Sequence, residues 1–318
     1  MASGKYSKNK QKDREEEQEM KKGSTFNILK KASSSNKVEI TGDLLKQVQG
    51  TLLQMLKDFA AVCDRNGFYY SLCGGSALGA VRHQGFIPWD DDVDVFMLRK
   101  DYNKFLEIFD KELGDKYIIN APSINPEIGV PVTQIMKKDT VFRTYNNPTG
   151  DRCGIYIDLF VLENAPDNAI LRKLHGLGSL FWGYGLSCSR FNRMRDDLLK
   201  VYADAGDEVT NAIKSKARKG AFFKFLSVAT WNKRYDKWNS MCHNDDSKYV
   251  VCVVGLKHYF KEIFPRDIYG VTAKLKFEDT EFNVIKDYDW ALTRLYGDYM
   301  KVPPPEKQEK HFAIEVKL

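Results

Sequence analysis

The chain has 318 residues, of which 43% are hydrophobic and 29% are charged, enough for one large domain or two smaller ones around a buried core. Its 49 Lys and Arg residues are nearly matched by 43 Asp and Glu residues, and the net charge of +6 is dispersed, so the composition does not indicate a nucleic-acid-binding protein. Six cysteines without a C-x-x-C pair, and a polar N-terminus without a secretory signal, predict a reduced cytoplasmic protein rather than a disulfide scaffold.

No stretch reaches the ~18 apolar residues that a membrane span needs. The uncharged segment 176–189 comes nearest and is predicted to be a buried or interfacial helix. Cys242-His243 has no second ligand pair at a suitable spacing, which argues against a structural zinc site.

Residues 1–40 are rich in Lys, Glu, Ser, Asn and Gln and are predicted to form a disordered charged tail, with a membrane or partner contact as the minority interpretation. Apolar residues then recur at threes and fours from 44 to 63, which predicts an amphipathic helix that ends at Asn66-Gly67. A short strand over 68–73 leads to a turn at Gly74-Gly75, and Ser76 is expected to cap a short helix that ends at His83.

A loop over 85–89 precedes a second strand over 92–97, and the next helix starts at Asp101. Further strands are expected over 117–120, 130–136, 140–145 and 154–162. From 169 onward the pattern is mainly helical, and 196–218 is either an insertion loop or an exposed helix. A strand pair is expected at 249–254 and 274–282, and the proline run 303–305 is expected to end the last helix.

Four aspartates fall within five positions where the second strand begins: Asp90, Asp91, Asp92 and Asp94. Because strand side chains alternate between faces, Asp92 and Asp94 point the same way while the valines between and after them enter the core. Two carboxylates on one face repel each other, and a divalent cation removes that repulsion. Mg²⁺ suits such a site because it takes oxygen ligands and keeps positions for water and phosphate. Asp90 shares the parity but precedes the strand, so it is either a ligand or a support, and Asp91 faces away.

A magnesium site has two alternatives. An EF-hand starting at Asp90 would need glycine and glutamate where the chain has Val95 and Asp101. A solvated acidic loop is the other alternative, and the apolar strand that follows and the glycine turn upstream argue against it.

The turn Gly74-Gly75-Ser76 is suited to a phosphate, because glycines let the backbone approach its oxygens and the following helix N-terminus offers free N–H groups. Asp158 lies in the middle of an apolar strand, where a carboxylate costs several kcal/mol unless it is paired or metal-bound. It is either the buried partner of an Arg or Lys, or a third acidic residue that holds metal or deprotonates an acceptor hydroxyl.

These residues carry a family resemblance. The stretches 74–83 and 85–95 resemble the signature of the LicD family, and further matches are 99–102, Tyr156-Ile157-Asp158-Leu159-Phe160 and 296–300 with Pro303-Pro304. The resemblance covers about residues 42–311 and is most specific at the first motif.

The resemblance implies an α+β, nucleotidyltransferase-like fold, with a small mixed sheet flanked by helices. It divides the chain into the tail 1–40, a catalytic core 41–165 and a mainly helical C-terminal part 166–318 that completes the acceptor side. It also implies Mg²⁺-dependent transfer of phosphocholine from CDP-choline to a sugar hydroxyl of a bacterial cell-surface glycan (teichoic acid, lipopolysaccharide or capsule precursor), with release of CMP; Mn²⁺ is the alternative metal.

Carried onto this chain, the resemblance makes Asp92, Asp94 and Asp158 catalytic, with Asp158 as general base, and adds Asp90 to them as the metal site. It implies that substrate contacts come from Gly74, Gly75, Ser76, Arg82, Trp89, Lys137 and Arg143. The basic residues would neutralise phosphate, with a surface ion pair as the alternative, and Trp89 would cover a quaternary ammonium, with core packing as the alternative.

Three other functions stay open. The chain could transfer ribitol phosphate or glycerol phosphate from a CDP-linked donor, place a nucleotide on an acceptor, or be a noncatalytic membrane-surface or scaffold protein. The acceptor would be a glycan or lipid-linked glycan, and the basic-aromatic stretch 214–234 is either a membrane contact at the inner face or a plain helical surface.

Overall fold

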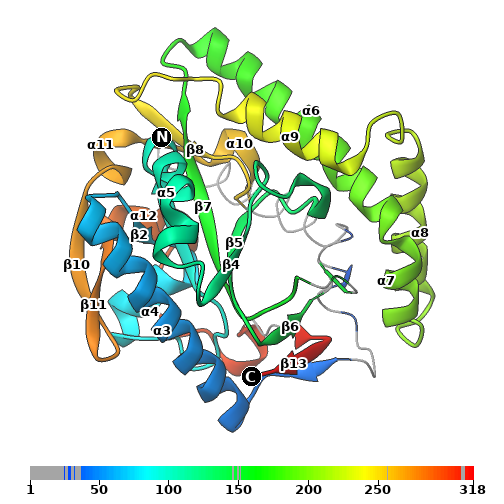
Figure 1. Cartoon of the computed structure of the whole chain (residues 1–318), viewed down its shortest axis with the longest axis horizontal. Coiled ribbons are helices and arrows are strands. Elements are labelled where there is room, and N and C mark those ends of the chain that lie inside the picture. Colours follow the sequence, from blue (N-terminus) through cyan, green and yellow to red (C-terminus); the bar gives the residue numbers. More distant parts are fainter. Residues whose placement is uncertain are drawn as a thin grey trace, which may run out of the picture.

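The computed structural model describes residues 25, 28–29, 32, 37–144, 147–148, 150, 152–255, 257–308 and 312–318. Within them lies a nine-stranded mixed sheet with the order β10-β11-β2-β3-β7-β5-β4, from which β8 and β9 continue off β7. In Figure 1, β7 runs through the middle of the molecule, with α3 to α5 on one side of it and α6 to α9 above and on the other. The α+β class with a mixed sheet flanked by helices is therefore confirmed, with a sheet larger than expected.

The first elements form the core of the sheet. Helix α3 (Gly42–Asn66) ends at Gly67, whose φ of 65° is the left-handed conformation that glycine adopts without strain, as the sequence predicts. Strand β2 (Ser71–Leu72), helix α4 (Gly74–His83), strand β3 (Asp94–Leu98) and helix α5 (Arg99–Glu112) follow. The apolar faces of α3 and α5 pack against fully buried strand residues such as Val95 and Leu159.

The centre of the sheet is completed by β4 (Tyr117–Asn120), the 3₁₀ turn η1 (Pro126–Ile128), β5 (Thr133–Lys137) and β7 (Tyr156–Ala165), while β6 (Val141–Arg143) pairs elsewhere. Strand β3 pairs parallel with β7, and β5 pairs antiparallel with the other edge of β7. These pairings place residues from three separate chain segments side by side on one face of the sheet.

The helical segment predicted after 169 consists of α6 (Ala169–Arg193), α7 (Arg195–Val201), α8 (Asp207–Ala221) and α9 (Val228–Asn239). Fully buried Trp231 and buried Tyr235 pack in a second core, which the helices share with Ala165 of β7 and Val251. The segment 196–218 is thus mostly helix, which settles the choice between a loop and an exposed helix.

After these helices the chain returns to the sheet through β8 (Tyr249–Cys252), β9 (Ile263–Pro265), β10 (Thr272–Phe277) and β11 (Thr280–Ile285), with the one-turn helices α10 (His258–Lys261) and α11 (Arg266–Tyr269) between them. The predicted pairing of 249–254 with 274–282 is wrong. β8 pairs with β7 and β9, whereas 272–285 folds into its own hairpin, because Glu278 with a φ of 56° reverses the chain between Phe277 and Thr280.

The last elements are α12 (Tyr288–Tyr296), η2 (Pro305–Lys307), β12 (Phe312–Ala313) and β13 (Glu315–Lys317). The prolines do not end α12, contrary to the prediction. The helix stops at Gly297, whose φ of 77° is incompatible with helix, and Pro305 instead begins the 3₁₀ turn.

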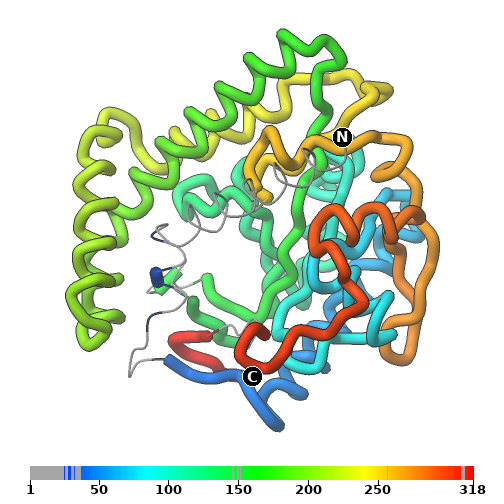
Figure 2. Tube along the Cα trace, turned by 180° about the vertical axis from the view of Figure 1, so that it is seen from behind, coloured from blue at the N-terminus to red at the C-terminus, as the bar shows by residue number. Residues whose placement is uncertain are grey.

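The N-terminal prediction holds only in part. Strand β1 (Val38–Glu39) pairs with β12, and the two chain segments lie side by side at the bottom of both Figure 1 and Figure 2. Leu29 is fully buried against Leu198 and Ile213. The tail prediction is therefore wrong for Leu29 and for β1, since apolar contacts and strand pairing order them, and residues 1–24, 26–27, 30–31 and 33–36 lie outside the described residues.

Two further expectations concern the cysteines and the membrane. All six cysteines are free, and all but Cys242 are buried, in agreement with the predicted reduced thiols. Among the described residues, no helix combines the length and the apolar character needed to span a membrane.

Candidate active site

A polar row crosses the central strands where they begin. Asp94, the first residue of β3, lies opposite Asp158 of β7, and Asp158 lies opposite Gln134 of β5. The Gln134 amide donates a hydrogen bond of 3.0 Å to Asp158 Oδ1. Neighbouring strands are about 4.8 Å apart, so the Asp94 and Asp158 carboxylates emerge side by side on one face. The structure thus joins two segments that are more than sixty residues apart.

The alternation predicted at the start of β3 is confirmed. Asp92 and Asp94 are half-buried, while Val93 and Val95 are fully buried on the other face. The strand itself begins at Asp94 rather than at residue 92, but the Asp158 N–H donates to the Val93 carbonyl, so the residue before the strand already follows β7. Asp91 is buried and faces away from this pair, as its parity predicts.

The glycine turn lies directly against the aspartates. Gly74 has a φ of 54°, and a Cβ atom there would lie 3.2 Å from Asp94 Oδ2 and 3.9 Å from the Tyr296 hydroxyl. A Cβ atom on Gly75 would lie only 2.8 Å from Asp90 Oδ2. Because both glycines begin α4, the free N–H groups and positive dipole end of this helix face the carboxylates.

Ser76 has a different local role from the predicted one. The residue at the helix N-cap is Cys73, and Ser76 lies inside the first turn, so the prediction that Ser76 caps the helix is wrong. Its buried hydroxyl accepts a hydrogen bond of 2.9 Å from the Asp94 N–H and keeps its own proton to donate. Ser76 therefore fixes the start of α4 to the start of β3.

The Cys73 thiol reports how the carboxylates converge. Burial raises the pKa of this thiol well above its usual value, and the negative charges of Asp94, Asp92 and Asp158 raise it further. The three carboxylates therefore all act on the same buried thiol beside Gly74.

The structure does not bring the predicted basic residues into this row. Arg82 lies at the far end of α4, where its Nη1 donates to the Tyr299 carbonyl at 2.8 Å, and burial lowers the pKa of its guanidinium. Lys137 lies over the Tyr117 ring on the face of the sheet that α3 covers. Arg143 pairs with Glu315 of β13 at 2.8 Å. The contacts of Arg82 and Arg143 hold C-terminal segments, and phosphate binding by all three residues stays a prediction.

Trp89 lines a cavity of about 220 Å³ between the loop before β3 and the start of α3. The other aromatic ring in the lining is Phe312, and the carboxylates there belong to Glu39 and Asp91. Trp89 also packs against the main core. The structure is therefore compatible with both a binding role and a packing role for this residue.

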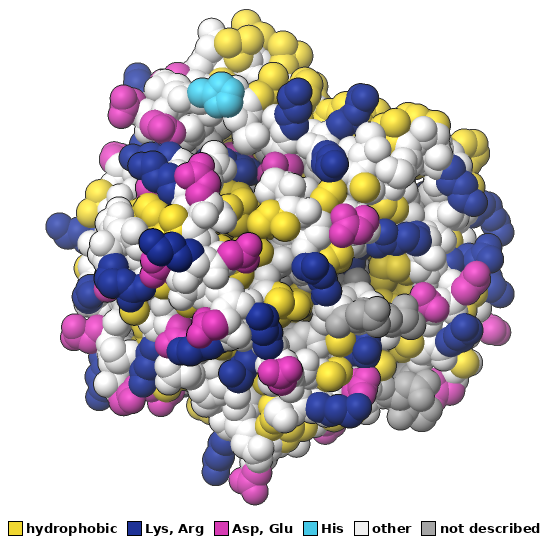
Figure 3. Space-filling model, viewed as in Figure 1, with side chains coloured by type: hydrophobic (Ala, Val, Ile, Leu, Met, Phe, Trp, Pro, Cys, Tyr) yellow, Lys and Arg dark blue, Asp and Glu magenta, His cyan; other side chains and the backbone are white. Residues whose placement is uncertain are grey.

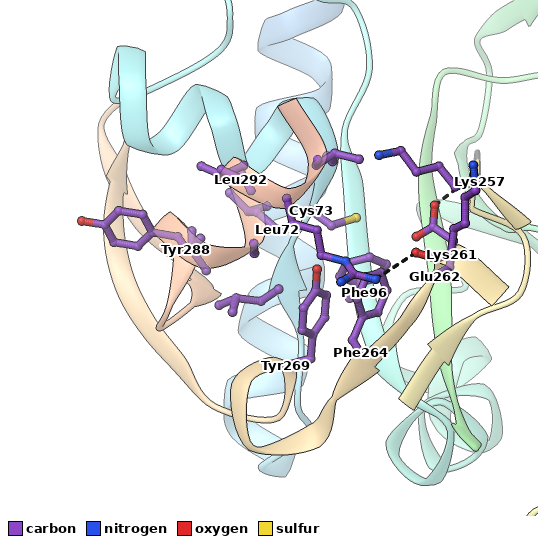
Figure 4. Close-up of a pocket in the computed structure, with 17 residues that line it drawn as sticks. Leu72, Cys73, Phe96, Lys257, Lys261, Glu262, Phe264, Tyr269, Tyr288 and Leu292 are labelled. Atoms are coloured by element: carbon purple, nitrogen blue, oxygen red, sulfur yellow. Dashed lines mark hydrogen bonds between the residues drawn. The ribbon is translucent and has the colours of Figure 1, made fainter. Parts of the chain in front are cut away.

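A second pocket, which sequence reasoning missed, opens beside the glycine turn (Figure 4). Cys73, Gly74 and Phe96 form its side nearest to the aspartates, and its interior is apolar and aromatic, with Phe264 stacked on Tyr269 at 4.0 Å. Cationic side chains at the pocket are those of Lys257, Lys261 and Arg294.

The buried carboxyl of Glu262 lies among these cations. It accepts a hydrogen bond of 3.0 Å from the Lys257 N–H, and burial raises its pKa. The residues that build this pocket come from distant elements, and apart from Gly74 none was singled out in the sequence.

The chemistry of the acidic row fits Mg²⁺. The described residues contain no group of three or more His, Cys, Asp and Glu side chains close enough together to hold a metal by themselves. Mg²⁺ is commonly bound by only one or two carboxylates, with water and substrate phosphate as its other ligands. The Asp94–Asp158 pair with Asp92 beside it suits this mode, and metal binding stays a prediction.

Gln134 and Tyr296 also belong to the site and were missed. Gln134 had a weak signal, because it is a polar residue beside the apolar pair Ile135-Met136 in its strand. Tyr296 had none beyond the family resemblance, because only the fold brings the end of α12 to Gly74.

Comparison with known proteins agrees with this geometry. Residues 67–171, which contain the glycine turn and the four predicted metal ligands, match the model of the LicD/FKTN/FKRP nucleotidyltransferase domain. The chain is 30% identical over 278 residues to the lipopolysaccharide cholinephosphotransferase LicD of Haemophilus influenzae, covering 85% of this chain and 97% of that protein. An uncharacterised protein of Rickettsia typhi is 41% identical over 66 residues, which is 20% of this chain and 21% of that protein. An uncharacterised protein of Rickettsia prowazekii is 43% identical over 51 residues, which is 16% of this chain and 19% of that protein. The chain belongs to the LicD family.

Proposed function

We propose that the protein transfers phosphocholine from CDP-choline to a sugar hydroxyl of a bacterial cell-surface glycan, with Mg²⁺ as cofactor and CMP as the second product. The observation that carries this proposal is the Asp94–Asp158 pair at the N-terminus of α4. The nearly full-length similarity to a lipopolysaccharide cholinephosphotransferase supports the class of donor and acceptor.

In this proposal the diphosphate of the donor lies across the start of α4. The backbone N–H groups of this turn would bind its oxygens, and Gly74 and Gly75 leave room for that approach. The nucleoside would lie in the pocket beside Cys73 and Phe96, whose cations would bind phosphate or ribose oxygens at its mouth. Bound Mg²⁺, held by Asp92 and Asp94 with Asp90 in support, would supply charge that offsets the charge of the transferred phosphoryl group.

Asp158 would act as the general base. The Gln134 amide holds its Oδ1 atom and thereby orients the carboxylate, and Oδ2 would receive the proton. The acceptor hydroxyl would give its proton to Asp158 while its oxygen bonds to the phosphorus that carries choline, and the bond from that phosphorus to CMP breaks. Asn120, opposite Gln134 in β4, extends the same polar row toward the side where a sugar could approach.

The lining of the cavity beside Trp89 favours a cationic group over an uncharged alcohol. Aromatic rings and carboxylates together recognise quaternary ammonium groups through cation–π and charge interactions. Ribitol phosphate or glycerol phosphate would gain nothing from Asp91 and Glu39 at the same place.

The test is CMP release from CDP-choline with Mg²⁺ and a lipid-linked glycan, beside CDP-ribitol and CDP-glycerol. Trp89→Leu is expected to reduce kcat/KM for CDP-choline about tenfold and to leave that for CDP-ribitol unchanged. Equal loss with both donors would contradict the choline assignment. A folded protein that releases CMP from no CDP-alcohol would establish the noncatalytic alternative.

We further propose that the reaction takes place at the inner face of the membrane, on a lipid-linked acceptor, by a peripherally bound enzyme. The name of the similar protein supports a membrane-anchored acceptor, since a lipopolysaccharide carries its glycan on lipid.

A further inference from the structure

One face of α6 exposes an unbroken apolar stripe. Its side chains recur at threes and fours along the first four turns of the helix: Ile170, Leu174, Leu177, Phe181 and Tyr184, with Leu171 and Leu180 at its margins. Ile170 is 71% exposed, although burying such a side chain would stabilise the protein by about 2 kcal/mol. A continuous stripe of this kind marks an interaction surface.

The turn between α8 and α9 extends this surface. Phe222 and Phe225 are 81% and 69% exposed. The Phe225 ring lies 5.4 Å from the Trp231 ring, which in turn lies 5.9 Å from Phe181 of α6. Phe225 therefore lies near the stripe, across the buried Trp231, and Phe222 precedes it in the same turn; we call the combined surface the α6 face.

The segments that build the α6 face contain no acidic residue. Neither 169–193 nor 209–235 has an aspartate or glutamate, in a chain that carries 43 of them. Both segments are rich in cations: Arg172, Lys173, Arg190, Arg193, Lys214, Lys216, Arg218, Lys219, Lys224, Lys233 and Arg234. Figure 3 shows hydrophobic side chains along the upper edge of the molecule, where α6 lies in Figure 1, with Lys and Arg side chains beside them.

We propose that the α6 face binds the surface of a bilayer that contains anionic lipid. An apolar helix stripe flanked by cations is the pattern of helices that lie in the membrane interface, where the stripe enters the acyl boundary and the cations contact the headgroups. A second copy of this chain fits less well, because a two-fold interface would bring the same cations together. Nucleic acid would leave the apolar stripe without a partner.

The α6 face is connected to the pocket of the candidate active site. Phe260 of α10 packs on α6 at Gly176, where a Cβ atom would lie 2.6 Å from the ring, and Phe260 is itself partly exposed. The next residue, Lys261, lines the pocket shown in Figure 4. A membrane held by α6 would therefore lie one short helix away from the pocket. The link between membrane binding and catalysis rests on the proposed reaction, whereas membrane binding itself does not.

The experiment is cosedimentation of the full-length protein with vesicles, without donor or acceptor. One set contains phosphatidylcholine alone and the other contains phosphatidylcholine with phosphatidylglycerol. We expect binding to the anionic vesicles that weakens as salt is raised. Phe222→Ser with Phe225→Ser should weaken binding at least about tenfold. Lys219→Gln with Lys224→Gln should weaken it about fivefold per cation.

Matched controls lie on the opposite side of the protein, in and before β10. Val271→Ser removes an exposed apolar side chain and Lys276→Gln removes an exposed cation, and both should bind like the wild type. Absence of binding to anionic vesicles, or equal binding by test and control variants, would overturn the proposal. A wild-type dimer in solution that the Phe222 and Phe225 substitutions dissociate would assign the face to a second copy instead. Because no substrate is present, these outcomes are independent of whether the proposed reaction occurs.

Discussion

Replacing Asp158 with asparagine separates the charge of this residue from its shape. The variant would keep the hydrogen bond from Gln134, because an asparagine side-chain carbonyl can accept from the amide that now donates to Asp158 Oδ1 at 3.0 Å. What Asp158→Asn loses is the negative charge beside Asp94 and the ability to accept a proton. We therefore expect folding to be preserved and catalysis to fail.

The expected change in stability follows from the distance between the Asp94 and Asp158 carboxylates, which the pairing of β3 with β7 sets. Two charges about 5 Å apart repel by about 3 kcal/mol at an effective dielectric constant near 20, and by less than about 1 kcal/mol in water. Since the pair is half-buried, removing one charge should stabilise the metal-free protein by about 1 kcal/mol. Loss of a general base should lower kcat by about 10² to 10⁴.

The assays are thermal unfolding with and without Mg²⁺, and CMP release. Wild-type protein should gain more stability from Mg²⁺ than Asp158→Asn, because the variant lacks the part of the repulsion that Asp158 contributes beside Asp94. Glu281→Gln, an exposed charge loss on β11, is the control and should leave kcat and the response to Mg²⁺ unchanged. Retention of more than about a tenth of kcat by Asp158→Asn would refute its role as the base. Equal stabilisation of both proteins by Mg²⁺ would refute a contribution of Asp158 to the metal site.

Three further outcomes are expected. Gly75→Ala should reduce kcat with little change in Tm, because its Cβ would lie 2.8 Å from Asp90 Oδ2 and displace that carboxylate. The control Gly50→Ala has nothing within 4 Å of its Cβ and should leave kcat unchanged and stability equal or higher. Equal kcat in the two variants would contradict the proposed role of Gly75. Glu163→Gln should cost about 3 kcal/mol of unfolding free energy in urea, because it breaks the buried ion pair with Arg99, and a cost below about 1 kcal/mol would show that the pair is dispensable. Burial lowers the pKa of His175, so the unfolded chain takes up a proton below about pH 6.5 that the folded protein excludes, and stability should fall with pH below that value by at most about 1.4 kcal/mol per pH unit. An unchanged slope in His175→Gln would assign the acid sensitivity to other groups.

The sequence predicted those features that depend on neighbours along the chain. The spacing of apolar residues sets the buried face of α3, and alternation separates Asp92 and Asp94 from Val93. The glycine turn before α4 follows equally from local conformation, since Gly74 adopts a φ of 54°. Periods of 3.6 and 2 residues express backbone geometry, which does not need the rest of the fold.

Tertiary structure alone decided which distant residues meet. The strand register places Gln134 beside Asp158, and α12 brings Tyr296 to Gly74. The same register directs Lys137 to the opposite face of the sheet, and β13 pairs Glu315 with Arg143, so neither cation reaches the carboxylates through the contacts observed. A shift of one residue in pairing would exchange these faces, and that register depends on the packing of the whole sheet against its helices rather than on any local pattern.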